Sequence, residues 1–126
     1  MQEYTVMVYN DRTEWYQDGK LHRIDGPAVE YTYGYTDGYT AWYQNGKRHR
    51  EDGPAIECNT GDRYWYQNGK FHRIDGPAIE HSDGNKEWWI GGTEYTEEEF
   101  NEKTQSKQLT VAEIEKLLGY KIKIIA

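Results

Sequence analysis

Residues 64–80 read YWYQNGKFHRIDGPAIE, and the same pattern occurs twice more in the chain. Residues 41–57 read AWYQNGKRHREDGPAIE and residues 14–30 read EWYQDGKLHRIDGPAVE, so the three segments align without gaps. A fourth start, EWWIGGTEYTEEEF from Glu87, keeps the tryptophan and a Gly-Gly pair and then departs. The anchoring residues are Trp15, Trp42, Trp65 and Trp88, which are 27, 23 and 23 positions apart. Repetition of this kind indicates one structural unit used several times.

Each repeat predicts a β-hairpin followed by a bend. Asp-Gly or Asn-Gly comes directly after Trp-Tyr-Gln in every copy, and these dipeptides suit a type I′ turn, whose two central residues have positive φ. Gly and Pro within a strand are tolerated only at a bulge, a bend or an edge, so we expect a bend near Gly26, Gly53 and Gly76. A second turn then closes each unit. Chained hairpins predict a mainly β fold, an antiparallel meander with a period of about 23 residues.

The length of 126 residues favours a single domain with three parts. Residues 1–13 are expected to form an N-terminal strand that caps the repeats. Residues 14–90 form the hairpin repeats themselves. Residues 91–126 are expected to form a helical C-terminal cap that ends in a short strand.

The C-terminal part carries helix signals. Thr96-Glu-Glu-Glu99 and Thr110-Val-Ala-Glu113 both fit the capping box that opens a helix. An apolar stripe at helical spacing follows the second box, and Gly119 supplies a stop. We expect this second helix to pack on a face of the sheet or to cap its last edge. Residues 121–125 read KIKII, and the alternation of lysine and isoleucine over 121–124 predicts a final strand.

Charge and cysteine content exclude several functions. The formal net charge is −7 and the pI is near 5.1, so phosphate is repelled and general nucleic-acid binding is not expected. Dense carboxylates, the usual basis of nucleic-acid mimicry, occur only at residues 97–99. Cys58 is the only cysteine, which excludes an intrachain disulfide and favours the cytoplasm. No apolar run approaches the roughly 20 residues of a membrane span, and the N-terminus does not resemble a signal peptide.

The repeat pattern Trp-Tyr-x-Asn-Gly-Lys-x-His-Arg-x-Asp-Gly-Pro-Ala over residues 14–90 resembles the variant MORN-like repeats of bacterial and bacteriophage proteins. The ending, with Trp88-Trp89-Ile90 and residues 96–100 and 109–119, looks like the tail of small phage-encoded proteins of this kind. The resemblance implies an interaction scaffold without assigned catalytic residues, acting in the bacterial host cytoplasm. It does not imply which partner is bound.

Three kinds of polar residue recur in every repeat and are the candidates for chemistry. They are His22, His49 and His72; Arg23, Arg50 and Arg73; and Asp25, Asp52 and Asp75. Equivalent histidines of a meander lie roughly 10 Å apart, whereas a zinc ion lies about 2.0–2.1 Å from each ligand nitrogen. We therefore expect each imidazole to bond a neighbouring carbonyl or stack on a ring. Each Arg–Asp pair is expected to hold the Gly-Pro bend by ionic hydrogen bonds rather than to act as an acid–base pair. The sequence therefore predicts a non-enzymatic protein that binds neither a metal ion nor a cofactor.

Binding is expected where the repetition fails, first of all at residues 31–39. This segment contains the four-residue excess of the first step and carries Tyr31, Tyr33, Tyr35 and Tyr39. Tyrosine and glycine are typical of binding loops, where tyrosine offers contact area at a low entropy cost. The alternative is a longer hairpin whose tyrosines pair across strands.

The second departure is at Arg48 and Glu51. The flanking repeats have leucine or phenylalanine at the first position and isoleucine at the second, namely Leu21 and Ile24, and Phe71 and Ile74. We expect the apolar residues to lie beneath a cap or a partner. The central pair of charges is expected in solvent and is a second candidate contact.

Two functions of different classes remain. The first is a protein-binding module that blocks or redirects a host defence component, such as a restriction, CRISPR or immune-signalling protein. The second is a small-molecule binder that sequesters a nucleotide signal between aromatic rings and the repeated arginines. Open sheet edges also allow a homo-oligomer. The phage-like repeat, the exposed aromatic faces and the absence of a recognisable catalytic motif together motivate the first function.

Overall fold

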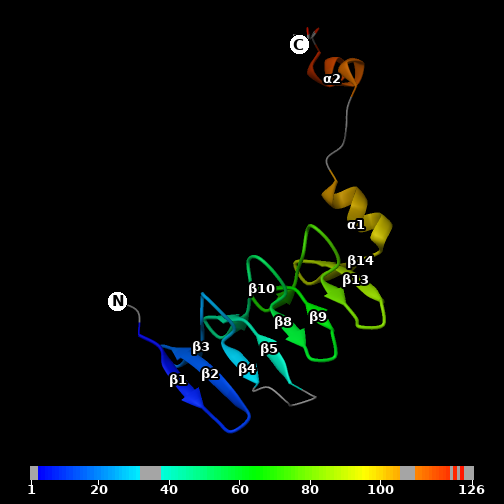
Figure 1. The fold of residues 1–126 in the computed structure, drawn as a ribbon. Coiled ribbons are helices and arrows are strands. Elements are labelled where there is room, and N and C mark those ends of the chain that lie inside the picture. Colours follow the sequence, from blue (N-terminus) through cyan, green and yellow to red (C-terminus); the bar gives the residue numbers. More distant parts are fainter. Residues whose placement is uncertain (1–2, 32–37, 106–109, 120, 122, 124–126) are drawn as a thin grey trace.

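The structure is a computed structural model that describes residues 3–31, 38–105, 110–119, 121 and 123. These residues form an antiparallel sheet followed by two helices (Figure 1). The strands are β1 (Thr5–Val8), β2 (Arg12–Gln17), β3 (Lys20–Leu21), β4 (Val29–Tyr31), β5 (Tyr39–Ala41), β6 (Tyr43–Gln44), β7 (Lys47–Arg48), β8 (Ile56–Cys58), β9 (Arg63–Tyr64), β10 (Tyr66–Gln67), β11 (Lys70–Phe71), β12 (Ile79–Glu80), β13 (Lys86–Ile90) and β14 (Thr93–Tyr95). The helices are α1 (Glu97–Thr104) and α2 (Val111–Leu118).

The sheet is the predicted antiparallel meander. Its longest path runs β1-β2-β4-β5-β8-β9-β12-β13-β14, and β3 pairs with β2 beside that path. The short hairpins β6–β7 and β10–β11 form the tips of the second and third repeats. β1 pairs with β2 as the expected N-terminal strand and is the outermost strand at its end.

The expected bends interrupt the returning strand of each repeat. In the first repeat the chain leaves β2 after Leu21 and pairs with it again from Val29. One residue of β2 bridges the gap, because the Trp15 amide donates to the Ala28 carbonyl at 2.7 Å and its carbonyl accepts from His22 N at 3.0 Å. The same two bonds recur at Trp42 and Trp65. Each bend is therefore a loop out of the returning strand that is closed around the backbone of one tryptophan.

The hairpin turns have the predicted geometry. The pairs Asp18-Gly19, Asn45-Gly46 and Asn68-Gly69 all have positive φ at both residues, from 50° to 81°. Two positive values in succession are the signature of a type I′ turn. Of the second turns, Gly61 and Gly84 also have positive φ, whereas residues 36 and 37 lie outside the described residues.

Replacing Gly46 with valine is expected to lower the free energy of unfolding by about 1–3 kcal/mol. A β-branched side chain is strained at the φ of 79° found there. The Gly46 amide also donates to the Leu21 carbonyl of the preceding repeat at 2.9 Å, so a distorted turn loses this contact as well. Chemical denaturation measures the change. Gly46→Asn is the control, because asparagine tolerates this conformation; an equal loss in both variants would contradict the explanation.

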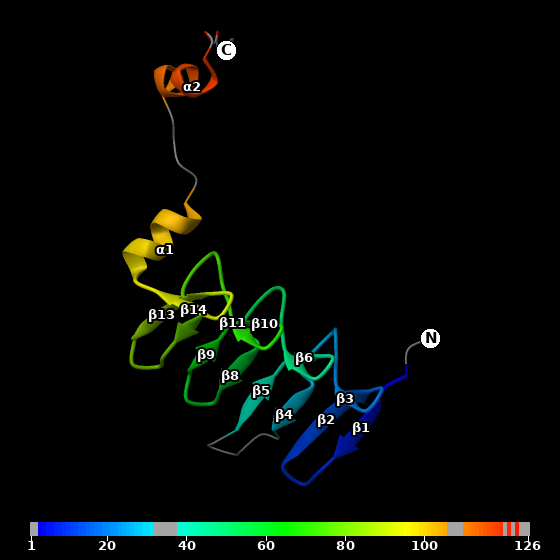
Figure 2. The same cartoon turned by 180° about the vertical axis from the view of Figure 1, so that it is seen from behind.

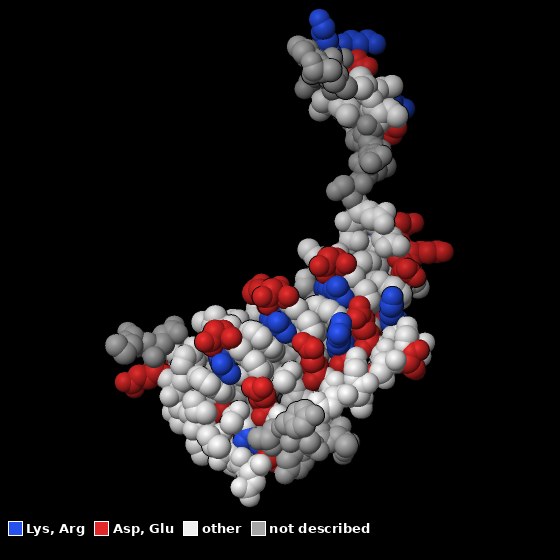
Figure 3. All heavy atoms as spheres, viewed as in Figure 1, with Lys and Arg blue, Asp and Glu red and all other residues white. Residues whose placement is uncertain are grey.

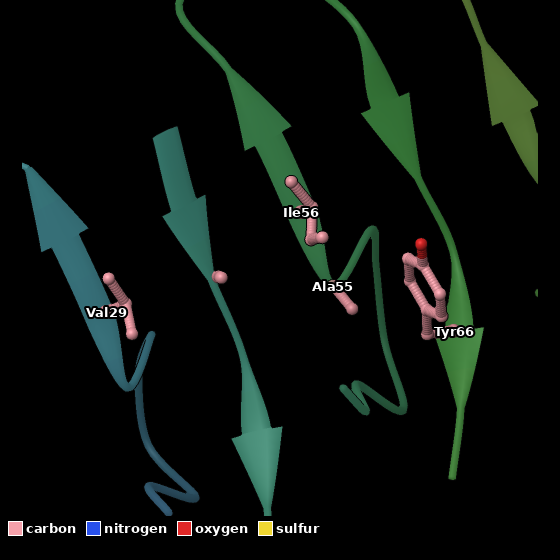
Figure 4. Packing of buried hydrophobic residues seen from close by; sticks show 5 residues of the cluster. Val29, Ala55, Ile56 and Tyr66 are labelled. Atoms are coloured by element: carbon pink, nitrogen blue, oxygen red, sulfur yellow. The ribbon is translucent and has the colours of Figure 1, made fainter. Parts of the chain in front are cut away.

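The core is a thin layer on the sheet and holds few aliphatic side chains. Figure 4 shows Val29, Ala55, Ile56 and Tyr66 on neighbouring strands, and Ala41 belongs to the same buried cluster. The alanine after each Gly-Pro is completely buried in all three repeats. The neighbouring strands therefore leave too little space around this alanine for a larger side chain.

Helix α1 covers the last edge of the sheet. Thr96 accepts from the Glu99 amide and the Glu99 side chain accepts from the Thr96 amide, so the predicted capping box is present. Phe100 is only 4% exposed, and α1 contacts β13 and β14. Neither described helix is long and apolar enough to cross a membrane.

Helix α2 has the predicted caps but not the predicted packing. Its capping box at Thr110 and its left-handed Gly119 are both present. None of its residues is buried, and it stands apart from the sheet in both views (Figures 1 and 2). The expectation that this helix packs on the sheet was wrong. Within the expected final strand, Lys121 and Lys123 are not in a strand, and the other residues lie outside the described part of the chain.

Candidate binding groove at the repeat bends

The arginine of each repeat braces its own bend. Arg50 donates from Nε to Asp52 Oδ1 at 3.1 Å and from Nη1 to the Pro54 carbonyl at 3.1 Å. Its guanidinium carbon lies 4.1 Å from the centroid of the Trp42 ring. The equivalent contacts join Arg23 to Asp25, Pro27 and Trp15, and Arg73 to Asp75, Pro77 and Trp65. Ionic hydrogen bonds and a cation–π contact thus hold the same bend three times.

The bend glycine makes room for that guanidinium. A Cβ atom on Gly53 would lie 2.9 Å from Arg50 Cζ, closer than real Cβ atoms come to another carbon. The same atom would lie 2.7 Å from the guanidinium carbon at Gly26 and 2.8 Å at Gly76. None of these three glycines has a positive φ. Close approach of the guanidinium, and not backbone conformation, therefore favours glycine here.

The histidines link each repeat to the next. Nδ1 of His22 accepts from the Asn45 amide at 3.0 Å, and His49 accepts in the same way from Asn68 at 3.0 Å. His72 accepts from the Gly91 amide at 2.9 Å. The bonding partner is an amide and not the carbonyl that we expected, whereas the expected ring stacking occurs at His22, whose ring centroid lies 6.3 Å from that of Tyr4. Each imidazole satisfies a turn amide of the following hairpin, and among the described residues no three metal-ligand side chains come together.

A groove of about 650 Å³ lies between the second and third bends. The second bend forms one side and the third repeat forms the other. Gln67 joins them, since its Nε2 donates to the Arg50 carbonyl at 3.0 Å. The lining residues are Arg50, Glu51, Asp52, Gly53, Pro54, Trp65, Gln67, His72, Arg73, Ile74 and Asp75.

The charges that this groove presents to solvent are mainly negative. The side chains of Asp52 and Asp75 are 82% and 81% exposed, whereas the two arginines of the groove are about 20% exposed. Each arginine is bound to a second carboxylate as well, Arg50 to Glu57 at 3.4 Å and Arg73 to Glu80 at 3.2 Å. Figure 3 shows acidic side chains in rows across the repeats with basic ones between them. The basic groups are thus neutralised within the fold, while the outer carboxylates remain accessible.

Of the two charged residues that depart from the repeat, only Glu51 lines the groove. Its carboxylate lies 2.5 Å from Nε2 of the buried His49. Arg48 instead donates to the hydroxyls of Tyr43 at 3.4 Å and Tyr66 at 3.3 Å. Arg48 and Glu51 are therefore not a charged pair, because each is bonded to a different neighbour.

The equivalent apolar residues are also divided. Leu21 and Phe71 pack against the buried cluster of the sheet. Ile24 and Ile74 are exposed, so within the described part of the chain no cap covers them, and their cover by a partner stays a prediction. The side chain of Ile74 lines the groove, so an apolar surface lies beside the acidic residues of its rim.

The tyrosine-rich segment is described only at its two ends. Tyr31 and Tyr39 lie in β4 and β5 with ring centroids 4.9 Å apart, and both rings pack against the buried cluster. Burial, followed by the neighbouring Tyr31, raises the pKa of Tyr39 above its usual value. Tyr33 and Tyr35 lie outside the described residues. The described tyrosines therefore make the cross-strand contact of the hairpin alternative.

Sequence reasoning missed most of the groove. Asp52, Asp75 and Trp65 occupy positions that are the same in every repeat, and the sequence therefore predicts structural roles for them. One oxygen of each aspartate has that role, because it accepts a hydrogen bond from an arginine. Nothing in the sequence indicates that the same carboxylate is also exposed to solvent. Isoleucine precedes Asp25 and Asp75 but glutamate precedes Asp52, so the sequence offers no common signal for the exposed carboxylates.

The chain matches no protein-family model, no curated protein and no solved structure.

Proposed function

We propose that the chain is a non-enzymatic protein-binding module whose groove between the second and third bends takes a basic segment of a partner protein. The observation that supports this is the acidic rim formed by Glu51, Asp52 and Asp75 around arginines that are already bonded within the fold. Charge complementarity of this kind selects partners and speeds their association. Lysine or arginine side chains of the partner reach the carboxylates.

The rim is prepared for binding before a partner arrives. Asp52 and Asp75 each accept from the Nε of an arginine that is itself stacked on tryptophan. Carboxylates held in place lose little conformational freedom on binding, which favours affinity. Ile74 beside the rim offers an apolar surface for the aliphatic part of a lysine or arginine side chain.

The nucleotide-binding alternative requires free guanidinium groups and free aromatic faces. Arg50 and Arg73 are each bonded to two carboxylates and a carbonyl. They also cover one face of the tryptophan of their own repeat. This arrangement favours a protein ligand over a phosphate-bearing one. The resemblance to phage-encoded repeat proteins supports a defence component in the bacterial host cytoplasm as the partner.

The proposal predicts that the double variant Asp52→Asn plus Asp75→Asn weakens binding at least about tenfold, which corresponds to about 1.4 kcal/mol. The purified chain is used to capture proteins from bacterial lysate, and the affinity of the captured protein is then measured at low and high salt. Binding is expected to weaken as salt rises, because the contact is ionic. Asp25→Asn is the matched control, since Asp25 makes the same bond to its arginine but does not line the groove.

Two outcomes contradict the proposal. One is a partner that binds the groove variant and the Asp25→Asn control equally well. The other is a variant with Tyr33→Ala plus Tyr35→Ala that loses the partner while the groove variant retains it, because the tyrosine segment would then be the binding surface. Mass spectrometry of the heated protein checks the nucleotide alternative, and a released stoichiometric nucleotide would support that function instead.

A further inference from the structure

The two ends of the sheet differ in whether another described element packs against them. At the C-terminal end α1 contacts β14, and Phe100 of α1 is buried. At the other end β1 is the outermost strand, and among the described residues no element pairs with its outer side. Figures 1 and 2 show β1 at the end of the sheet opposite α1. Natural edge strands are normally protected by charge, proline, a bulge or a covering element.

The hydrogen-bonding groups of Val6 and Val8 point away from the sheet. Val6 lies opposite Trp15, whose amide and carbonyl are both used on the other side of β2. Val6 and Trp15 are thus a non-hydrogen-bonded pair, and the backbone groups of Val6 face outward. Val8 is two residues further along β1 and has the same direction. Tyr9 turns back to β2, since its amide donates to the Arg12 carbonyl at 2.8 Å.

The side chains of β1 are apolar and exposed. Val6 is 40% exposed, Met7 is 43% exposed and Val8 is 77% exposed. None of the devices that protect edge strands occurs in β1, whose sequence is Thr-Val-Met-Val. Glu3 is the only charged side chain among residues 1–9, so this edge is locally almost neutral although the chain carries a net charge of −7.

We propose that β1 pairs with β1 of a second copy of the chain, antiparallel, to join two sheets into one. Two registers that bring outward groups together place Val6 opposite Val6 or opposite Val8 of the second copy. The first register places Glu3 opposite Tyr9 and keeps the pairing within the extended residues. The second register places Glu3 opposite Asp11, a like-charge contact that also lies in the turn after β1. Charge and strand length therefore select the register centred on Val6, which is self-complementary as twofold symmetry requires.

The pairing predicts a dimer whose mass in sedimentation equilibrium is twice the chain mass of 14.9 kDa. Val6→Pro removes an amide that β2 does not use, and Val8→Lys places a charge on the edge. Each variant is expected to raise the dimer dissociation constant at least about tenfold while circular dichroism stays unchanged. Ile24→Lys is the matched control, because it replaces an exposed apolar residue away from the edge and is expected to leave the dimer intact.

A cysteine pair tests the register. In a Cys58→Ser background, Val6→Cys is expected to form a disulfide with its equivalent, since Cα atoms of a hydrogen-bonded antiparallel pair are about 5.5 Å apart. Val8→Cys has no cysteine opposite it and is expected to crosslink much less. A wild-type chain that stays monomeric, or a dimer that Val8→Lys leaves unchanged, would overturn the proposal. Binding of a partner protein's strand at this edge, with no self-association, would overturn it too.

Discussion

Replacing Gly53 with alanine is expected to lower the free energy of unfolding by about 2 kcal/mol. The added methyl group would occupy the place of the Arg50 guanidinium, whose carbon lies 2.9 Å from the ideal Cβ position. Arg50 must then move away from Asp52, Pro54 and the Trp42 ring. Unfolding in urea, followed by tryptophan fluorescence, measures the loss.

A double-mutant cycle isolates the cause. An Arg50→Ala background removes the three atoms that lie nearest to the Cβ position of Gly53, and Gly53 does not have a positive φ. Gly53→Ala is therefore expected to be nearly neutral or slightly stabilising there, because alanine reduces the freedom of the unfolded chain. If the glycine substitution costs the same in both backgrounds, the guanidinium is not the reason for glycine at the bend.

Replacing Ala55 with leucine is expected to destabilise the fold by about 3 kcal/mol. Ala55 is completely buried, and its carbonyl accepts from the Trp42 amide at 2.7 Å. A leucine at this position pushes apart the strands that this bond joins. Thermal unfolding is the measurement, with a clearly lower midpoint as the expected result.

The control for this substitution is Ala112→Leu in α2. Ala112 is exposed, so the same added volume meets solvent instead of a packed layer. We expect a change within about 0.5 kcal/mol, because surface substitutions away from special features are usually tolerated. Equal destabilisation at the two sites would mean that the alanine after Gly-Pro is not required for packing.

The sequence was sufficient for the local structure, because each signal depends on residues that are close in the chain. Asn-Gly and Asp-Gly require positive φ at two adjacent residues, and the structure has it in all three turns. Thr96 and Glu99 satisfy each other's amides within one helical turn, so their capping box is equally local. The repeat spacing then determines the order of the strands, since each hairpin has only its neighbours to pair with.

The sequence could not predict contacts that join one repeat to the next. His49 accepts from the amide of Asn68, and the choice of an amide over a carbonyl depends on how the following turn is placed. The same holds for the close approach of Arg50 to Gly53, which the bend creates in three dimensions. Recurrence marked these residues as structural without showing which atoms meet.

The candidate groove depends even more on tertiary structure. Glu51 departs from the repeat pattern, and the sequence therefore marked it as a candidate contact. Asp52 and Asp75 follow the pattern, so the sequence indicated only a structural role for them. Their exposure, and the bonding of the arginines beside them, follow from the packing of two neighbouring bends. The sequence by itself determined the repeated hairpins, their turns and the helix caps, because these obey short-range rules of backbone conformation. Only the tertiary structure decided which carboxylates face solvent and that no described element pairs with the outer side of β1, because both depend on what lies beside each strand in space.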